Sequence, residues 1–490
     1  MFASIDDKHN SRLFRISAVF KDEEIDGERL QEAVRLVMPR YPAFNYRGRK
    51  GFFWAYLEKA ADLPVVRREE YFPAALRRLG SGNKPEIEFL YYKRRIAVEA
   101  NHVLGDGMGV LEILKSVIAQ YMVLGGIDKS EFPDIRFGDT VPSEEEYENP
   151  FVRLKNNEKI SKLPRGKAYV IPKCYEENYQ NCINGLVDLD TLKKICKEKG
   201  VTVTDFISAV LIHSIIKADK KGIDDTVIIE VPCNIRNIFP SVTARNFTGS
   251  VPVQFSPKGR RDYLIDDILE AVRGQLKENN SSVYHQEFIN SNYAMTENKI
   301  LQPVPYFIKK LVVNGRQKKT HNTEQTILFS NLGNITLPSV MHEKIERFEF
   351  VGGDARVYDM SMFCSSVSFN GYMNISFSLT GRDHAIPISF FRSLTEMNIP
   401  VRVESSLGNG IEEKTEASPK FCEECRVRLG EEYSLCPLCD AKAKAYEKED
   451  MYFSTALYPV TFKRDIPPYV DKKNRSLSAE KLKAYFILQP

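Results

Sequence analysis

Hydrophobic and polar residues alternate in two different ways between residues 87 and 124. Residues 87–92 and 96–101 have the period-two pattern of paired strands, and the charged turn 93–95 separates them, so they predict a β-hairpin. Apolar residues then recur at helical spacing from Val110 to Tyr121, before two glycines that favour a helix end. The sequence NHVLGDG therefore lies on a connection from a strand to a helix, where side chains reach a cleft while regular elements hold the backbone.

The second half of the chain repeats this alternation of helices and strands. A second hairpin is predicted around Asn370-Gly371, a dipeptide that suits a type I′ turn. The apolar residues 373, 375, 377 and 379 alternate with polar ones, which predicts a strand with only one face in a core. Helical spacing predicts helices from residue 26 to Pro39–Pro42, over 190–199, from 204 onward, over 262–276 and over 390–396. A strand pattern predicts a strand over 226–232.

These elements indicate an α/β protein built from two similar lobes. The polar and charged stretch around 142–164 is interpreted as the crossover between them, and the Gly-, Ser- and Glu-rich stretch near residue 410 as a linker. The predicted boundaries are 1–160 for the N-terminal lobe, 161–403 for the C-terminal lobe, 404–420 for the linker, 421–445 for a cysteine-containing module and 446–490 for a tail.

Composition narrows the class of protein without naming an activity. The 490 residues are 43 % hydrophobic and 28 % charged, typical of globular proteins of two or three domains. A net charge of +3 gives no electrostatic footprint for nucleic acid. The polar N-terminus does not resemble a secretion signal, and no apolar stretch has the length of a membrane span. Five of the nine cysteines are scattered, as reduced core thiols are, so we expect a cytoplasmic protein.

The connection at residues 101–107 has the residues that a general base requires. The neutral imidazole of His102 can take a proton from an incoming hydroxyl or amine at cellular pH. Asp106 is four positions away, where its carboxylate can brace the loop, while Gly105 and Gly107 permit a sharp turn and a close approach of substrate. The alternative is structural, because a histidine and an aspartate near a turn also occur as a helix cap and a surface pair.

The HxxxDG pattern from His102 to Gly107 resembles the signature of the thioester-dependent acyltransferase superfamily. This superfamily includes chloramphenicol acetyltransferase, alcohol acetyltransferases, BAHD enzymes and the condensation domains of peptide synthetases. The resemblance extends over most of residues 1–400, through the segments DGERLQEAVRLVMPRYPAF, VPCNIRNIFPSVTARNFTG and SNLGNITLP. In the second segment Arg236, Pro240, Asn246 and Gly249 follow the order expected of the superfamily.

The resemblance implies two chloramphenicol acetyltransferase-like α/β sandwich lobes with a tunnel between them. The catalytic histidine would lie in the middle of that tunnel, and the motif aspartate would pair with an arginine, for which Arg236 is the candidate; the alternative is a surface arginine. Condensation domains usually have two adjacent histidines, whereas Asn101 precedes His102 here. The BAHD segment DFGWG is also missing, so an alcohol acetyltransferase-like enzyme is the favoured interpretation.

The expected function is transfer of an acyl group, favouring acetyl, from acyl-CoA to a small alcohol or amine, with His102 as general base. One rival is a condensation-type enzyme that takes its acyl group from a carrier-protein thioester. The other rival is a catalytically silent binding scaffold. A folded His102→Ala protein that lost thioester turnover would dismiss the scaffold.

The strongest local pattern is a pair of CxxC sequences near the C-terminus. Cys422, Cys425, Cys436 and Cys439 have the spacing with which four thiolates bind one tetrahedral Zn²⁺. A zinc ribbon with four cysteine ligands leaves no position for water, so the zinc is expected to be structural. A protein partner or a capping role for the second lobe suits the ribbon better than nucleic acid does. His213, His384 and Cys364 are interpreted as core or loop residues rather than catalytic groups.

Overall fold

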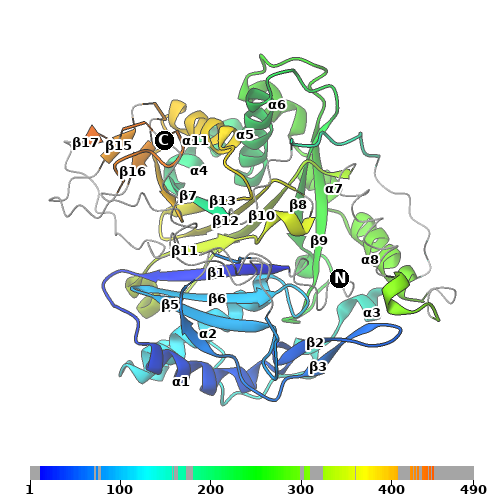
Figure 1. Ribbon diagram of the computed structural model, residues 1–490, viewed down its shortest axis with the longest axis vertical. Helices are drawn as coiled ribbons and strands as arrows, with labels where there is room; N and C mark the ends of the chain where they lie inside the picture. The colour runs from blue at the N-terminus through cyan, green and yellow to red at the C-terminus, as the bar shows by residue number, and fades with distance from the viewer. Residues whose placement is uncertain are drawn as a thin grey trace, which may run out of the picture.

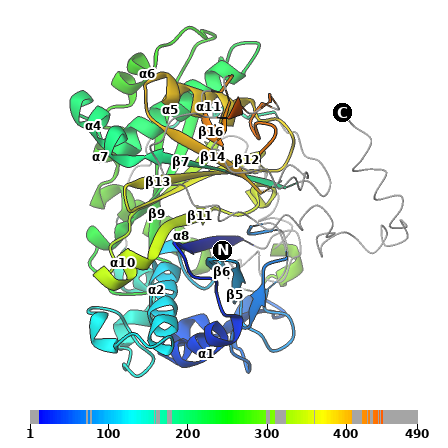
Figure 2. The ribbon, with the colours of Figure 1, turned by 90° about the vertical axis from the view of Figure 1, so that its left-hand side faces the viewer.

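Two β-sheets with helices on their outer sides form the body of the protein in the computed structural model (Figures 1 and 2). The structure describes residues 12–70, 73–75, 79–156, 158, 164–172, 180–297, 303–309, 324–358 and 360–406, and, nearer the C-terminus, 420–422, 424–425, 427–429, 433–439, 441–442 and 444–445. Residues 407–419 of the predicted linker 404–420, and the predicted tail 446–490, lie outside the described residues.

In the described part of the chain, the first sheet has five strands in the order β11-β1-β6-β5-β4. The strands are β1 (Leu13–Phe20), β4 (Val66–Arg68), β5 (Ile87–Tyr92), β6 (Arg95–Asn101) and β11 (Ile345–Val351). The predicted hairpin is β5–β6, with Lys93 at a positive φ in its turn. Helices α1 (Gly27–Val37) and α2 (Gly107–Leu124) bury their apolar faces under this sheet.

The second sheet has ten strands within the described residues, in the order β17-β15-β16-β14-β7-β13-β12-β10-β8-β9. Its strands are β7 (Asn181–Asp188), β8 (Val227–Asn234), β9 (Thr248–Phe255), β10 (Ile327–Asn334), β12 (Met362–Phe369), β13 (Tyr372–Leu379), β14 (Val401–Ser405), β15 (Lys420–Cys422), β16 (Val427–Leu429) and β17 (Lys444–Ala445). The predicted Asn-Gly hairpin joins β12 to β13, with both turn residues at positive φ.

Helices on the outer side of the second sheet cover its largest hydrophobic core (Figure 2). They include α4 (Leu189–Lys199), α5 (Val203–Ala218), α6 (Ile265–Val272), α7 (Gln275–Asn279) and α11 (Ala385–Glu396). The predicted helix over 262–276 is wrong in its extent, because Gly274 adopts a positive φ and separates α6 from α7. The helix predicted over 390–396 is correct in kind but begins five residues earlier, at Ala385.

The remaining elements lie between or beside the lobes. The short α3 (Pro150–Leu154) packs near α8 (Ser282–Glu297), and α10 (Ser339–Lys344) leads into β11. A separate two-stranded ribbon consists of β2 (Tyr46–Lys50) and β3 (Ala55–Lys59).

Among the described helices, α2 by itself is long and apolar enough to cross a membrane, and α4 with α5 would be so as a pair bent by 92°. Since 61 % of the apolar window of α2 is buried, that helix is accounted for as a core helix.

One strand crosses between the lobes, which the sequence boundaries did not anticipate. Strand β11 comes from within residues 161–403, yet it pairs antiparallel with β1 at the edge of the first sheet, as Figure 1 shows. The lobe formed by residues 1–160 in sequence therefore acquires a strand from residue 345 onward in space. Backbone hydrogen bonds join the two parts of the chain directly.

The prediction that β13 has only one face in a core is wrong. Both faces are buried: residues 373, 375, 377 and 379 face the helices, whereas the alternate residues 374, 376 and 378 face the first sheet. Ser376 Oγ donates to Asn184 Oδ1 at 2.6 Å in this polar layer. Polar alternation reflects burial against a polar neighbour here rather than exposure to water.

A network of buried charges spans the two sheets. Arg347 on β11 is 3.1 Å from Glu349 on the same strand and 3.0 Å from Glu404 on β14 of the other sheet. Four arginines balance four glutamates in this network: Arg15, Arg95, Arg347 and Arg402 with Glu69, Glu99, Glu349 and Glu404. Their side chains are at most 2 % exposed, so the pairing offsets a large desolvation cost.

Candidate active site

The candidate base His102 follows the last residue of β6, directly before α2. Its backbone N–H donates to the carbonyl of Arg12, which extends the pairing between β6 and β1 by one residue. Its ring packs 5.2 Å from that of Phe14 on β1, at an interplanar angle of 59°. The end of a sheet strand and an aromatic ring thus hold the histidine at the boundary of the two lobes.

A side chain from the second lobe determines which nitrogen of His102 bears the proton. Asn246 Nδ2 donates to the carbonyl oxygen of His102 at 2.6 Å, and this contact fixes the orientation of the amide. Asn246 Oδ1 then faces His102 Nδ1 at 2.8 Å. Because an amide oxygen only accepts, Nδ1 is the donor, and Nε2 is left with the lone pair in the neutral ring.

Asp106 connects the start of α2 to the second lobe. It is the N-cap of that helix, and its Oδ1 accepts from Gly109 N at 3.1 Å. Its Oδ2 accepts from Phe247 N at 2.8 Å and lies 2.9 Å from Arg236 Nη1. The carboxylate is almost fully buried, and both of its oxygens have partners. This arrangement suits a structural anion rather than a second base.

Arg236 is fixed as thoroughly as its partner. Its guanidinium donates from Nε to the carbonyl of Thr243 at 3.0 Å and from Nη2 to that of Arg245 at 2.7 Å. These contacts close the loop 236–245, which brings Asn246 next to His102. The structure therefore brings the residues His102, Asp106 and Arg236 together, although Arg236 does not contact the imidazole in these interactions.

Glycines in the motif and just after it make the close approach of the two lobes possible. A Cβ atom at Gly105 would overlap the ring of Phe44 and press against the carbonyl of Ala244. At Gly107 it would overlap the side chain of Leu332, which lies in the sequence segment 330–338. Of these three glycines Gly109 has the least space, because a Cβ atom there would overlap the carbonyl oxygen of Ala244.

The surroundings of His102 keep its imidazole neutral. Although the residue retains partial exposure, burial of the ring lowers its pKa below the usual value of about 6.5, and the nearby charge of Asp106 opposes this shift without reversing it. A neutral ring with Nδ1 occupied as a donor can accept a proton at Nε2. The arrangement is suited to general-base chemistry.

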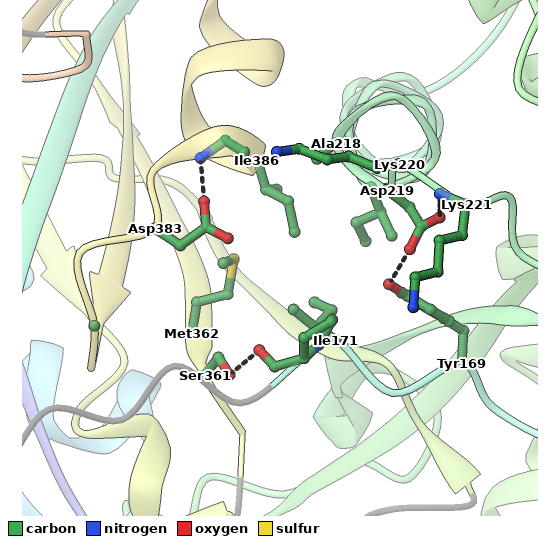
Figure 3. A pocket seen from close by; sticks show the side chains of 14 residues that line it. Tyr169, Ile171, Ala218, Asp219, Lys220, Lys221, Ser361, Met362, Asp383 and Ile386 are labelled. Carbon is green, nitrogen blue, oxygen red and sulfur yellow. Dashed lines mark hydrogen bonds between the residues drawn. The ribbon is translucent and has the colours of Figure 1, made fainter.

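A separate pocket of about 290 Å³ lies in the second lobe. Figure 3 shows Tyr169 donating its hydroxyl proton to Asp219 on one side, with Asp383 and Ile386 on the other. The pocket is at the C-terminal end of α5. The opposite end of that 16-residue helix, about 24 Å away, reaches toward the site through Thr204 Oγ1 and Asn331 Nδ2, 3.2 Å apart. None of the predicted site residues lines this pocket. The expected tunnel between the lobes stays a prediction.

The four C-terminal cysteines converge in the structure. The Sγ atoms of Cys422, Cys425, Cys436 and Cys439 all lie within 4.8 Å of one another. Cys422 and Cys439 are 3.6 Å apart at sulfur. Four thiolates around one tetrahedral Zn²⁺, with Zn–S bonds of about 2.3 Å, would be separated by about 3.8 Å, so this donor set fits the ion.

The other histidines and the thiol considered above are not gathered around His102. Burial lowers the pKa of His213 to about 4, and its Nδ1 lies 3.4 Å from Ser393 Oγ of α11. Cys364 is fully buried in the second core, and that burial raises its pKa, so its thiol stays protonated. His384 is the residue before α11.

Two contributors to the site were not assigned roles from the sequence. Asn246 was singled out only for its order in a resembling segment, and Gly109 was not considered. The signal for Asn246 was present, because Arg236 and Asp106 were expected to meet and Asn246 follows Arg236 by ten residues. Gly109 follows the HxxxDG pattern at helical spacing, but only the neighbouring Ala244 carbonyl explains it.

Comparison with known proteins agrees with this geometry at the level of the fold. No family model matches the chain, and no curated protein matches its sequence. TRI101 from F. sporotrichioides, solved with coenzyme A and T-2, is similar over 80 % of this chain and 97 % of its own, with 10 % identity and a TM-score of 0.52.

Two further solved structures are similar over comparable lengths. TRI3 trichothecene 15-O-acetyltransferase from Fusarium sporotrichioides matches 79 % of this chain and 90 % of its own, at 13 % identity and a TM-score of 0.47. The epimerization domain of tyrocidine synthetase B matches 80 % and 91 %, at 11 % identity and a TM-score of 0.49. The likeness to TRI101 shows the shared fold, and the expected α/β fold is confirmed at this level.

Proposed function

We propose that this protein is an acyltransferase that moves an acyl group from a thioester to a hydroxyl or amine, with His102 as the general base. The observation that carries the proposal is the pair of hydrogen bonds with Asn246. They hold the imidazole in one tautomer with Nε2 as the acceptor, which is the form required to take a proton from a nucleophile. A scaffold without chemistry has no need for this arrangement.

The reaction proceeds without a covalent enzyme intermediate. As the acceptor oxygen or nitrogen attacks the thioester carbonyl carbon, its proton moves to His102 Nε2. The carbon–sulfur bond then breaks, and the imidazolium returns the proton to the leaving thiolate, which yields the ester or amide and a free thiol. Asp106 and Arg236 keep the loops of both lobes in place during these steps, and Asn246 keeps Nδ1 protonated throughout.

We further propose acyl-CoA as the donor and a small alcohol or amine as the acceptor. TRI101, whose fold this chain shares, was solved with coenzyme A, and the chain has a single motif histidine preceded by Asn101. A donor bound to a carrier protein is the alternative. It predicts turnover with a loaded carrier protein and none with free acyl-CoA.

Release of free thiol from a panel of acyl-CoAs, with mixed alcohols and amines, tests the proposal. We expect acceptor-dependent release by the wild type and a loss of about 10²- to 10⁴-fold in His102→Ala. The matched control is His342→Ala, an exposed histidine on α10, which should retain full activity. Equal release by wild type and His102→Ala would overturn the role of His102. No release with free or carrier-bound thioesters would favour the scaffold.

We also propose a structural Zn²⁺ bound by Cys422, Cys425, Cys436 and Cys439. When bound, the ion would join the end of β15 at Cys422 and the following turn at Cys425 to the second pair, Cys436 and Cys439. It would take no part in acyl transfer because all four positions are thiolates. The segment it closes packs on the second lobe: Val427, Leu429 and Leu438 belong to the large hydrophobic core. Tyr433 OH accepts from Ser405 N at 2.6 Å and donates to Ser405 O at 3.2 Å.

Metal analysis of the purified chain tests the zinc proposal. We expect one zinc per chain in the wild type and a loss of zinc in Cys436→Ser. Cys233→Ser, at a half-buried cysteine outside the cluster, should keep its zinc. Wild-type protein without stoichiometric zinc would overturn this proposal while leaving the acyltransferase proposal intact.

A cytoplasmic location remains part of the proposal. Among the described residues, Cys182, Cys196, Cys233 and Cys364 form no disulfide bond. Reduced cysteines of this kind suit the cytoplasm, where disulfides are rare. Fractionation of cells that express the tagged chain would test the location.

A further inference from the structure

The β2–β3 ribbon presents a row of exposed aromatic side chains at its tip. Phe52 is 70 % exposed, and Phe53, Trp54 and Tyr56 are each at least 40 % exposed. The ribbon stands outside the two large sheets, and Figure 1 shows it projecting sideways from the first lobe. A cluster of large apolar side chains on a projection differs from the scattered apolar residues of an ordinary surface.

A second segment, distant in sequence, supports this tip and adds to it. Tyr306 N donates to the carbonyl of Phe52 at 2.8 Å, and Lys309 Nζ donates to that of Phe53 at 3.0 Å. The Lys309 ammonium also lies 3.4 Å from the centre of the Trp54 ring. These contacts fix the backbone of the tip, and Phe307, the residue after Tyr306, is 64 % exposed.

Charge is distributed along the ribbon in a definite order. Lys50 pairs with Ala55 on the rung nearest the tip and Arg49 with Tyr56 on the next. Arg47 and Lys59 lie on the rungs farther back. Residues 46–59 therefore contain four basic side chains and a single acidic one, Glu58, a net charge of +3 on 14 residues.

We propose that the ribbon tip is a docking surface for an anionic lipid bilayer. The aromatic rings at the tip would enter the interfacial region, where Trp, Tyr and Phe are favourably placed. The basic residues on the rungs behind would then lie at the level of the lipid phosphates, which attract Lys and Arg. This is peripheral binding, and it adds no membrane span.

The shape and the order of the side chains favour a bilayer over a protein partner. A projecting tip has no concave surface that could receive an anchor residue of a protein partner. A lipid bilayer, by contrast, adapts to an inserted protrusion. The rings come first and the cations behind them, which matches the depth profile of a bilayer. The base of the ribbon begins two residues after Phe44, which packs on Gly105 of the candidate site, so the ribbon connects the docking tip to that site.

Trp54 makes the surface directly testable, because it is the only tryptophan in the chain. The full chain would be mixed with vesicles of phosphatidylcholine alone or with phosphatidylglycerol added. We expect the Trp54 emission to shift to shorter wavelength with the anionic vesicles, to be quenched by brominated lipid, and to return toward the free value at high salt. No shift and no flotation with anionic vesicles would overturn the proposal.

Variants separate the contributions of the rings and the charges. In Phe52→Ser/Phe53→Ser, which keeps Trp54 as reporter, partitioning should fall about tenfold or more. Lys50→Glu/Lys59→Glu should fall by a similar factor and lose the preference for anionic lipid. The matched controls Val141→Ser and Leu264→Ser remove apolar side chains that are 89 % and 68 % exposed elsewhere, and they should bind as the wild type does.

Other outcomes are equally decisive. Equal partitioning into neutral and anionic vesicles would overturn the role of the basic residues. An emission shift with an acidic carrier protein, but not with vesicles, would replace the bilayer by a protein partner. The inference is independent of acyl transfer, since His102→Ala should bind vesicles as tightly as the wild type.

Discussion

Asn246 makes two hydrogen bonds to one residue, and together they decide the protonation of His102. The backbone carbonyl orients the amide, and the amide then orients the imidazole. Neither bond alone would specify the tautomer, because an amide that is free to flip can donate as well as accept. The role of Asn246 is therefore that of a positioning residue.

Replacement of Asn246 should change the pH dependence of the reaction as well as its rate. In Asn246→Asp a carboxylate would face Nδ1 and favour the imidazolium, so the pKa of His102 should rise. The acidic limb of kcat/KM should then move to higher pH by about one unit or more. In Asn246→Ala we expect a lower kcat without this upward shift. A pH–rate profile that is unchanged in Asn246→Asp would contradict the proposed contact.

The proposed activity of the wild-type protein should persist below the usual pKa of histidine. Burial lowers the pKa of His102, so the ring stays neutral as the pH falls below about 6.5 and activity declines only through the lower native value. Over the same range the unfolded chain takes up protons that the native ring does not, so stability falls as the pH falls below about 6.5. A pH–rate profile and an NMR titration of His102 would measure both values. An acidic limb above 6.5 would contradict this.

At the scale of elements, the first turn of α2 depends on how closely a loop of the second lobe approaches it. Asp106 caps the helix and accepts from Phe247 N, while Gly109 leaves room for the Ala244 carbonyl. The same short loop thus satisfies the helix end and delivers Asn246 to His102. Packing and chemistry share one contact region.

Gly109→Ala should disturb this contact. The added methyl group would overlap a backbone carbonyl that cannot rotate away, so we expect a loss of about 1–3 kcal/mol in the free energy of unfolding and a lower kcat. Met108→Ala, at the neighbouring partly exposed position, serves as the control and should have a smaller effect. Urea denaturation measures the stability. A Gly109→Ala protein as stable as the wild type would show that the loop can move.

At the scale of the whole molecule, the buried arginines and glutamates connect the two sheets. Burial alone would lower the pKa of Arg347, but the carboxylates of Glu404 and Glu349 outweigh that effect and raise it. The network is balanced in charge, so the removal of any member leaves a buried charge without compensation. It thereby links the strand that crosses between the lobes to β14 of the other sheet.

Arg347→Met should destabilise the protein strongly. Glu404 and Glu349 would lose a buried partner, a change that typically costs about 3–5 kcal/mol. Arg35→Met, which removes the exposed pair with Glu32, should leave the unfolding transition unchanged. Denaturant unfolding of both variants would measure the difference. Equal stability of the two would show that the network contributes little to holding the lobes together.

Local features of the candidate site followed from the sequence, because they depend on neighbours in the chain. A strand before the HxxxDG pattern, a helix after it and the glycines between them were visible in the spacing of residues 87–126. The end of the predicted helix at residue 199, where Gly200 adopts a positive φ, and the turn at Asn370-Gly371 were visible for the same reason. The meeting of Arg236 with Asp106 was expected only from a resemblance, since 130 positions separate the two residues.

Some features could not be read from the pattern at all. The serines and asparagine on β13 look like a solvent face, yet the other sheet covers them. The break at Gly274 was hidden because apolar spacing continues across it in a helical manner. A residue's polarity reports the chemistry of its neighbour and not whether that neighbour is water.

The sequence by itself determined most of the helices that pack on the two sheets, the hairpins β5–β6 and β12–β13, the position of the candidate base between strand and helix, and the set of four cysteines. These features result from the spacing of residues close together in the chain, where backbone geometry limits the choices. The tertiary structure decided that β11 joins the first sheet, that charged strands are buried against each other and that Asn246 rather than Arg236 holds His102. Those contacts join residues far apart in sequence, and they depend on how two complete sheets pack, which local periodicity does not specify.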